Sequence, residues 1–167
     1  MKQSQIKVEG GKELAKLLRT LPDKVADKLM KNATLAGGRR LAKAIKNKAP
    51  VDTGRLRDSI KSKLDRTSKY TFTVNIGPTG KGRFYAHLVE FGSAPHVIKS
   101  KRKRVLSNGQ EIFGKIVKHP GTAAQPFMRP ALDESADDVI KHVSKNLGRG
   151  IEREAKKLAG TYKTNKR

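Results

Sequence analysis

The sequence predicts an α+β fold, in which long helices pack on a small antiparallel sheet and a basic β-arm projects from the body. Three observations support this prediction. Apolar residues recur at helical spacing in residues 22–48 and again in residues 126–147. Residues 70–77 alternate apolar and polar side chains, which is typical of a half-buried strand. Residues 95–121 are basic and rich in turn-forming residues, as an inserted hairpin would be.

The length and composition of the chain predict one domain with a thin core. The chain has 167 residues, of which 35% are hydrophobic and 5% aromatic, so the expected core is small and aliphatic. We expect a single domain over residues 1–147, with the basic arm of residues 95–121 inserted in it. Gly148 and Gly150 are expected to weaken the last helix, so residues 148–167 are assigned to a basic C-terminal extension.

The N-terminal part of the chain predicts a short edge strand followed by two helices. Residues 4–10 alternate apolar and polar side chains, and residues 12–21 carry leucines at the spacing of one helical face. Pro22 suits the first turn of the long second helix. Gly37 and Gly38 interrupt that helix, and such a pair marks a bend or a close helix crossing.

A corner between helix and sheet is expected where the long helix ends. Pro50 stops the helix, Asp52 or Thr53 can cap the next helical turn, and Gly54 frees the backbone.

Residues 83–92 are consistent with a strand or a short helix. The spacing of Phe84, of His87 or Leu88, and of Phe91 favours the helix, with Gly92 at its C-terminal stop. Further along, Asn108-Gly109 between two apolar runs is typical of a hairpin turn, which places the tip of the arm there.

The net charge of +23 implies an acidic or polyanionic partner, because self-repulsion of this size disfavours compaction and self-association. The segment that best suits such a contact is the basic run of the arm, made of Lys99, Lys101, Arg102, Lys103 and Arg104. No segment approaches the roughly 20 apolar residues of a membrane helix, and the N-terminus lacks a signal-peptide core. We therefore expect a soluble protein without a membrane partner.

Enzymatic and cofactor functions find no support in the sequence. GPTGKG at residues 77–82 lacks the spacing and the hydroxyl residue of a phosphate-binding loop. His87 and Glu90 stand one helical turn apart, but a second histidine-bearing pair that would complete a metal site is missing. The chain contains no cysteine, and no serine lies near a histidine–aspartate signature. We expect no catalytic residues, no metal and no cofactor.

Three segments resemble a family of phage virion proteins. They are APVDTGRLRDSI (49–60), YAHLVEFGS (85–93) and HPGTAAQPFMRPAL (119–132). In this order and at similar spacing they resemble the signature segments of the tail-component or neck family of long-tailed phages, typified by HK97 gene-product-ten-like and lambda minor tail Z-like proteins. With the preceding helix the resemblance covers residues 10–143. The basic arm and the C-terminal extension have no counterpart in the family pattern.

The resemblance implies a virion structural protein of the head–tail junction, which acts in the neck ring or in tail completion and joins the tail to the DNA-filled head. The implied partners are other copies in a hexameric or dodecameric ring, head connector or stopper proteins, tail terminator proteins, and genomic DNA in the channel. The protein would assemble in the host bacterial cytoplasm and remain in the virion. The matching residues are implied to be fold and subunit-contact positions: Pro50, Thr53, Gly54, Leu56, Ser59, Ile60, Tyr85, Glu90, Phe91, Gly92, Pro126, Phe127, Pro130 and Ala131.

Two further hypotheses remain open at this stage. A free, non-sequence-specific nucleic-acid-binding protein would also account for the net charge of +23, although it gives the VEFGS and QPFMRP segments no role. Within the family-like segments, Glu90 is a candidate to pair with Arg55 or Arg57.

Overall fold

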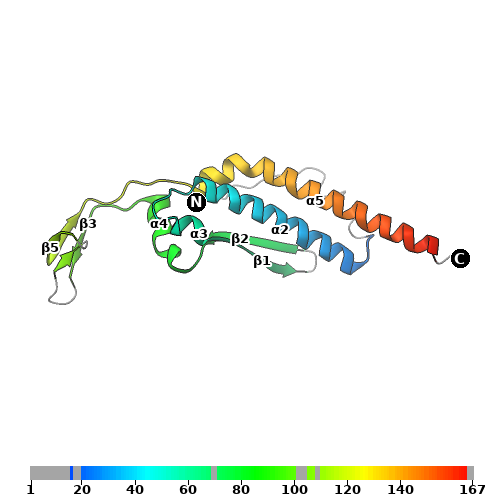
Figure 1. Cartoon of the computed structure of the whole chain (residues 1–167), viewed down its shortest axis with the longest axis horizontal. Coiled ribbons are helices and arrows are strands. Elements are labelled where there is room, and N and C mark those ends of the chain that lie inside the picture. The colour runs from blue at the N-terminus through cyan, green and yellow to red at the C-terminus, as the bar shows by residue number, and fades with distance from the viewer. Residues whose placement is uncertain (1–15, 17–19, 69–70, 101–104, 108–109, 165–167) are drawn as a thin grey trace.

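Two long helices, α2 (Asp23–Lys48) and α5 (Met128–Thr164), lie side by side along the length of the molecule and run in opposite directions (Figure 1). The computed structural model describes residues 16, 20–68, 71–100, 105–107 and 110–164. A two-stranded antiparallel sheet lies against α2, and further strand pairs project at one end of the molecule (Figure 1). The predicted α+β class, with long helices and small antiparallel sheets, is confirmed. The predicted edge strand and most of the helix over residues 12–21 lie outside the described residues.

Helix α2 can pack closely on two sides because Gly37 and Gly38 lack side chains. A Cβ atom on Gly37 would lie 2.5 Å from Cγ2 of Val143 in α5. A Cβ atom on Gly38 would overlap the side chain of Val74 in the sheet. The helix is continuous through both glycines, so the pair marks the close crossing that the sequence predicts.

The sheet consists of β1 (Ile60–Ser68) and β2 (Thr71–Pro78), of which only the second was predicted. The two strands pair antiparallel, with Leu64 opposite Val74. Along β2 exposed residues alternate with half-buried ones, because one face of the sheet packs on α2 and the other meets solvent. The sheet therefore supplies one layer and α2 with α5 the other.

Buried apolar side chains form two clusters at the two ends of the helix pair. The first surrounds Phe127 and Ile60, which are the largest fully buried side chains among the described residues. It unites residues from α2, α3 (Arg55–Ser59), β1, α4 (Arg83–Phe91) and α5. The second is smaller and joins Leu29 and Ala33 of α2 to Leu147 of α5. The thin aliphatic core that the composition predicts is observed.

Helix α5 runs without interruption through Gly148 and Gly150, so the helix does not end at these glycines. Packing outweighs propensity at Gly150, where a Cβ atom would lie 2.5 Å from Cδ2 of Leu29. The helix thus crosses the proposed boundary between residues 147 and 148, and the division into a domain and an extension stays a prediction.

The arm of residues 95–121 contains two short antiparallel strand pairs, and Figure 1 shows it projecting from the helical body. Strand β3 (His96–Lys99) pairs with β6 (Ile116–His119), and β4 (Leu106–Ser107) pairs with β5 (Ile112–Gly114). The basic run 101–104 and the turn at 108–109 lie outside the described residues. Whether the arm is a basic contact surface stays a prediction.

Candidate interaction site

The corner that follows α2 is set by backbone conformation. Ala49 leaves the helical region just before Pro50, and Gly54 adopts φ 75°, a left-handed conformation that favours glycine. Gly54 is the N-cap of the short helix α3, and no side chain caps that helix. The predicted capping role of Asp52 or Thr53 is therefore wrong, whereas the role of Gly54 is confirmed.

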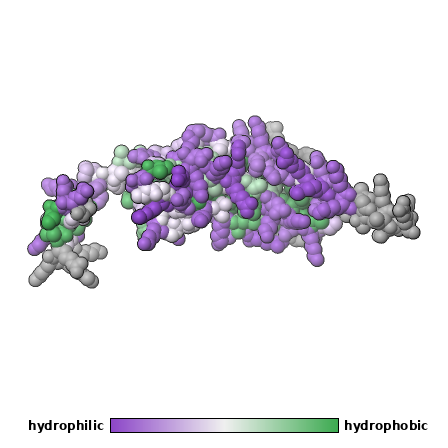
Figure 2. All heavy atoms as spheres, in the orientation of Figure 1, coloured by the Kyte–Doolittle hydropathy of each residue, from purple (hydrophilic) through white to green (hydrophobic). Residues whose placement is uncertain are grey.

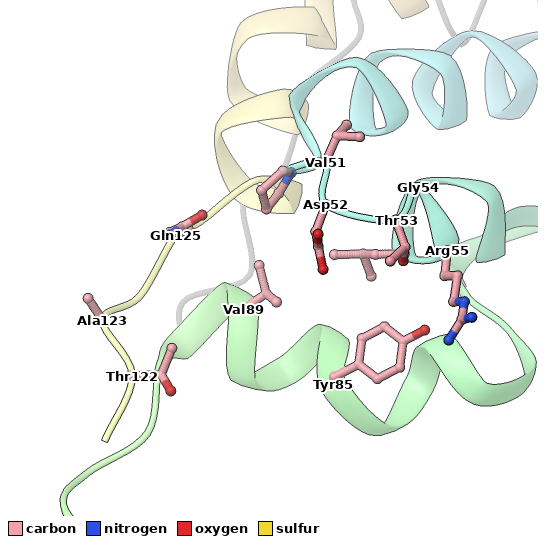
Figure 3. Close-up of a pocket in the computed structure, with 12 residues that line it drawn as sticks. Val51, Asp52, Thr53, Gly54, Arg55, Tyr85, Val89, Thr122, Ala123 and Gln125 are labelled. Carbon is pink, nitrogen blue, oxygen red and sulfur yellow. The ribbon is translucent and has the colours of Figure 1, made fainter. Parts of the chain in front are cut away.

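This corner forms one wall of an open cavity of about 550 Å³. The opposite wall is α4, and the segment before α5 closes one end (Figure 3). Figure 3 shows the carboxylate of Asp52 pointing toward the cavity, with the ring of Tyr85 facing it from α4. The lining residues come from all three family-like segments: Pro50, Val51, Asp52, Thr53, Gly54, Arg55, Leu56, Tyr85, Val89, Thr122, Ala123 and Gln125.

The buried carboxylate of Glu90 joins the second segment to the third. Glu90 is 7% exposed and accepts hydrogen bonds from the backbone N–H groups of Phe127 (2.8 Å), Met128 (2.9 Å) and Arg129 (3.2 Å). These N–H groups at the start of α5 have no partner within the helix, and a negative charge is favourable at this end. The hypothesis that Glu90 pairs with Arg55 or Arg57 is wrong, because the first turn of α5 takes its carboxylate.

Gly92 and Gly121, which lies against the carbonyl oxygen of Ser93, bring the ends of the arm together beside this cap. Gly92 (φ 71°) lies so close to the carbonyl oxygen of Thr122 that a Cβ atom would stand 2.5 Å from it. Ser93 and Thr122 exchange backbone hydrogen bonds of 2.9 and 3.0 Å. The N–H of Gln125 donates to the carbonyl of Val89 over 2.7 Å. Residues 89–93 and 122–125 therefore form a joined base from which the arm leaves the body.

The end of the first segment is locked to the loop before α4. Ser59 donates its hydroxyl to the carbonyl of Leu56 (2.6 Å), while its own carbonyl accepts both the N–H (2.9 Å) and the hydroxyl (2.8 Å) of Thr79. Gly82 lies directly against Ser59, where a side chain would have no space. Ser59 is thus a packing residue at this position.

The structure brings most of the family-like residues together, but in different environments. Those in or beside the first core cluster are buried: Gly54, Leu56, Ile60, Glu90, Phe127 and Ala131. Others are half-buried: Pro50, Ser59, Tyr85, Gly92 and Pro130. Thr53, Phe91 and Pro126 are exposed. Of the predicted basic site, Lys99 is exposed at the end of β3, and residues 101–104 lie outside the described residues.

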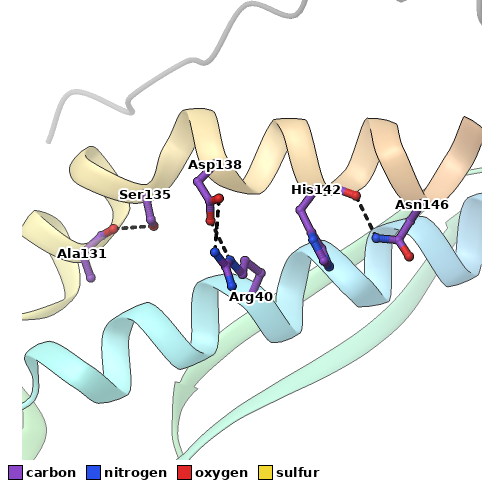
Figure 4. Close-up of polar contacts among 6 residues, drawn as sticks. All are labelled: Arg40, Ala131, Ser135, Asp138, His142 and Asn146. Atoms are coloured by element: carbon purple, nitrogen blue, oxygen red, sulfur yellow. Dashed lines mark hydrogen bonds and ion pairs between the residues drawn. The ribbon is translucent and has the colours of Figure 1, made fainter.

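Sequence patterns did not indicate the ion pair that joins α2 to α5. Arg40 donates from Nε to Oδ2 of Asp138 (2.6 Å) and from Nη2 to Oδ1 (3.2 Å), a two-point contact (Figure 4). The hydrogen bond from Arg40 lowers the pKa of Asp138 below its ordinary value, and the same bond raises the pKa of Arg40. Lys48 of α2 also contacts Glu134 of α5 at 2.7 Å, so a second ion pair joins the two helices.

In the part of the chain that the structure describes, no three histidine, aspartate or glutamate side chains gather where they could hold a metal ion. No described helix has the length and apolar character needed to cross a membrane. The cavity lining combines aliphatic groups and Tyr85 with polar residues that include Asp52 and Arg55. The Glu90 carboxylate is already occupied by three N–H donors.

Comparison with known proteins finds one family model that is similar to part of the chain. Residues 12–92 match the model of the HK97-gp10-like family, described as "Bacteriophage HK97-gp10, putative tail-component". This part of the chain is similar to the HK97-gp10-like family. The match contains α2, the first family-like segment and the second one as far as Gly92, while the third segment lies beyond it. The HK97-gp10-like family is one of phage tail components rather than of enzymes, which supports a structural role in a phage particle. Neither the curated proteins nor the solved structures include a match to this chain.

Proposed function

We propose that this HK97-gp10-like protein is a ring subunit of the head–tail junction, which acts in the neck or in tail completion and joins the tail to the DNA-filled head. The observation that carries the proposal is a set of large apolar side chains that the monomer leaves in solvent. Phe84, Phe91 and Phe113 are exposed, and they are three of the five phenylalanines in the chain. Exposed apolar patches of this kind mark protein–protein contacts.

One such patch is the α4 ridge, formed by Phe84, Leu88 and Phe91. These residues stand four and three positions apart, so they share one side of the helix. Their exposed fractions are 77%, 39% and 69%. The opposite side of α4 is fixed to the body through Ala86 and Glu90, which are buried. The ridge is therefore presented rigidly, as a surface for a neighbouring subunit should be.

The arm carries a second apolar patch. Ile112 and Ile116 are 75% and 61% exposed, and Val97 is 51% exposed. In Figure 2 the arm shows strongly hydrophobic residues, whereas the visible face of the helical body is mostly hydrophilic. Two-stranded pairs are marginally stable alone, so the arm benefits from a neighbouring surface. We infer that it reaches an adjacent copy in a hexameric or dodecameric ring, or a protein of the adjoining ring.

The net charge of +23 accounts for the choice of partners. A ring multiplies this charge, so assembly is opposed until acidic surfaces neutralise it. Such surfaces would belong to a head connector or stopper, to a tail terminator, or to genomic DNA in the channel. Assembly would then occur in the host cytoplasm, where these partners are made, and the finished position would be the head–tail junction of the virion.

The decisive experiment is electron microscopy of particles from cells that express the surrounding structural genes with and without this chain. Filled heads separated from tails in its absence, together with labelled protein at the junction in its presence, are the expected result. Normally joined particles in its absence would overturn the proposal.

A further inference from the structure

A basic groove of about 400 Å³ lies between α2 and the edge of β1, and none of its lining residues belongs to the α4 ridge or the arm. Four cationic residues line it: Arg39, Lys43 and Lys46 from α2, and Lys61 from β1. These four residues define the basic groove. Ala42, Ile60 and Ser62 complete its lining, so it contains a hydroxyl group and no carboxylate.

The cations of the basic groove are not neutralised within the described part of the chain. Arg40 and Lys48, which flank them on the same helix, are paired with Asp138 and Glu134. By contrast, the structure shows no ion pair between any of the four groove residues and a described acidic residue. Like charges four and three positions apart on a helix repel each other. The arrangement is therefore unfavourable until an anion binds.

The spacing of the cations suits a polyanion with regularly placed charges. From Arg39 to Lys46 the helix rises about 10 Å. One strand of duplex DNA carries a phosphate about every 3.4 Å of helix axis, so this row matches roughly three phosphates. Lys61 approaches the same groove from the sheet and broadens the contact.

The lining also distinguishes between nucleic acid and protein as the occupant. Ala42 and Ile60 are 7% and 0% exposed and belong to the packed interior, so the groove offers little apolar surface. Protein interfaces have an apolar core, whereas phosphate contacts require mainly cations and polar donors. The apolar side chains suited to protein contact lie elsewhere, on the α4 ridge and on the arm.

We propose that the basic groove binds backbone phosphates of duplex DNA, without reading its sequence. The choice of duplex DNA as the occupant rests on the proposed function, since DNA passes through a head–tail junction. The groove would then face the channel, and α2 with β1 would form the wall of the ring that meets DNA. This contact differs from the one predicted for the basic run of the arm.

The test uses the purified full chain and a fluorescein-labelled 30-base-pair duplex, with anisotropy measured at several NaCl concentrations. The groove variant is Arg39→Gln/Lys43→Gln/Lys46→Gln. A matched control, Lys141→Gln/Lys145→Gln/Arg149→Gln, removes the same charge from exposed cations at similar spacing on α5. Circular dichroism checks that both variants remain helical.

The groove variant should bind the duplex at least tenfold more weakly than the control at about 100 mM salt, since it loses roughly three phosphate contacts. Its slope of log affinity against log salt should become shallower by about 2.7, and the control slope should change much less. Equal losses in both variants would show that only net charge matters and would overturn the proposal. A groove variant that loses poly-glutamate binding at unchanged DNA affinity would also overturn it, in favour of an acidic protein. Particle imaging tests the proposed position at the head–tail junction separately from DNA binding by the basic groove. The protein can bind DNA through this groove wherever it is found in the virion.

Discussion

Glu90 and Phe127, which are 37 residues apart in the chain, are joined by a buried hydrogen bond of 2.8 Å from the backbone N–H of Phe127 to the Glu90 carboxylate. The same carboxylate accepts from the next two N–H groups of the chain. Helix α5 therefore begins against α4 at a position that is fixed from outside the helix. The fully buried ring of Phe127 packs in the first core cluster at the same place.

Replacing Glu90 should destabilise the protein. Glu90→Ala leaves three N–H groups of α5 without their acceptor and should lower the free energy of unfolding by about 2 to 3 kcal/mol. Glu90→Gln keeps one acceptor oxygen and should cost about 1 kcal/mol. Urea denaturation measures both. The control Glu134→Ala removes a solvent-exposed pair with Lys48 and should have little effect. Equal effects of Glu90→Ala and Glu134→Ala would contradict the capping role.

Substitutions of helical glycines by alanine should have opposite signs at different positions. Gly37→Ala and Gly38→Ala place a methyl group against Val143 and Val74, so each should destabilise by about 1 to 3 kcal/mol. Gly148→Ala meets no atom within 4 Å and should stabilise by roughly 0.5 to 1 kcal/mol, because alanine favours the helix. Thermal unfolding of the three variants tests this order, and a stabilising Gly38→Ala would show that the contact with β2 is looser than described.

The pair between Arg40 and Asp138 should make stability depend on pH in the acid range. The pKa of Asp138 is lowered in the folded protein, mainly by the hydrogen bond from Arg40. The unfolded chain therefore binds the proton more readily, so stability from this pair is complete above about pH 4 and is lost as the pH falls through the folded pKa. Asp138→Asn should lower the melting temperature at neutral pH, and its difference from the wild type should shrink below about pH 4. If the difference in melting temperature between Asp138→Asn and the wild type stays constant down to strongly acidic pH, this ionic contribution to stability is excluded.

The α4 ridge should matter for assembly more than for folding. Phe84→Ser/Phe91→Ser removes two exposed rings, so the melting temperature should stay close to that of the wild type. The amount of protein incorporated into particles, measured by quantitative mass spectrometry, should fall severalfold. The matched variant Phe84→Tyr/Phe91→Tyr keeps the rings and should incorporate normally. Undiminished incorporation of the serine variant would remove the ridge from the proposed interface.

The long helices and β2 could be predicted, because apolar side chains recur in each of them at the regular spacing of a helix or of a strand. Strand β1 was missed because its outward residues are charged and its inward face includes Ser62 and Arg66, which weakens the alternation. The continuation of α5 through Gly150 could not be predicted, because helix propensity is a local quantity, whereas the contact of Gly150 with Leu29 comes from another helix.

One feature of the sequence could have indicated the capping role of Glu90. Gln125, Pro126 and Phe127, which precede α5, are not residues that cap a helix N-terminus well, so the acceptor had to come from elsewhere in the fold. The cavity and the basic groove could not be predicted, because each combines residues whose contact depends on how α2 meets the sheet or how α4 meets the corner.

The joined base of the arm has a mechanical consequence. Residues 89–93 and 122–125 are tied by backbone hydrogen bonds immediately before the cap at Phe127. A force on the arm therefore acts first on these hydrogen bonds and then on the first turn of α5. This helix has 37 residues and is about 55 Å long. A rotation of only about 5° at that turn would displace the far tip by roughly 5 Å over a rod of this length. A force applied at one end of the molecule can thus be transmitted to the other end through the single stiff helix α5.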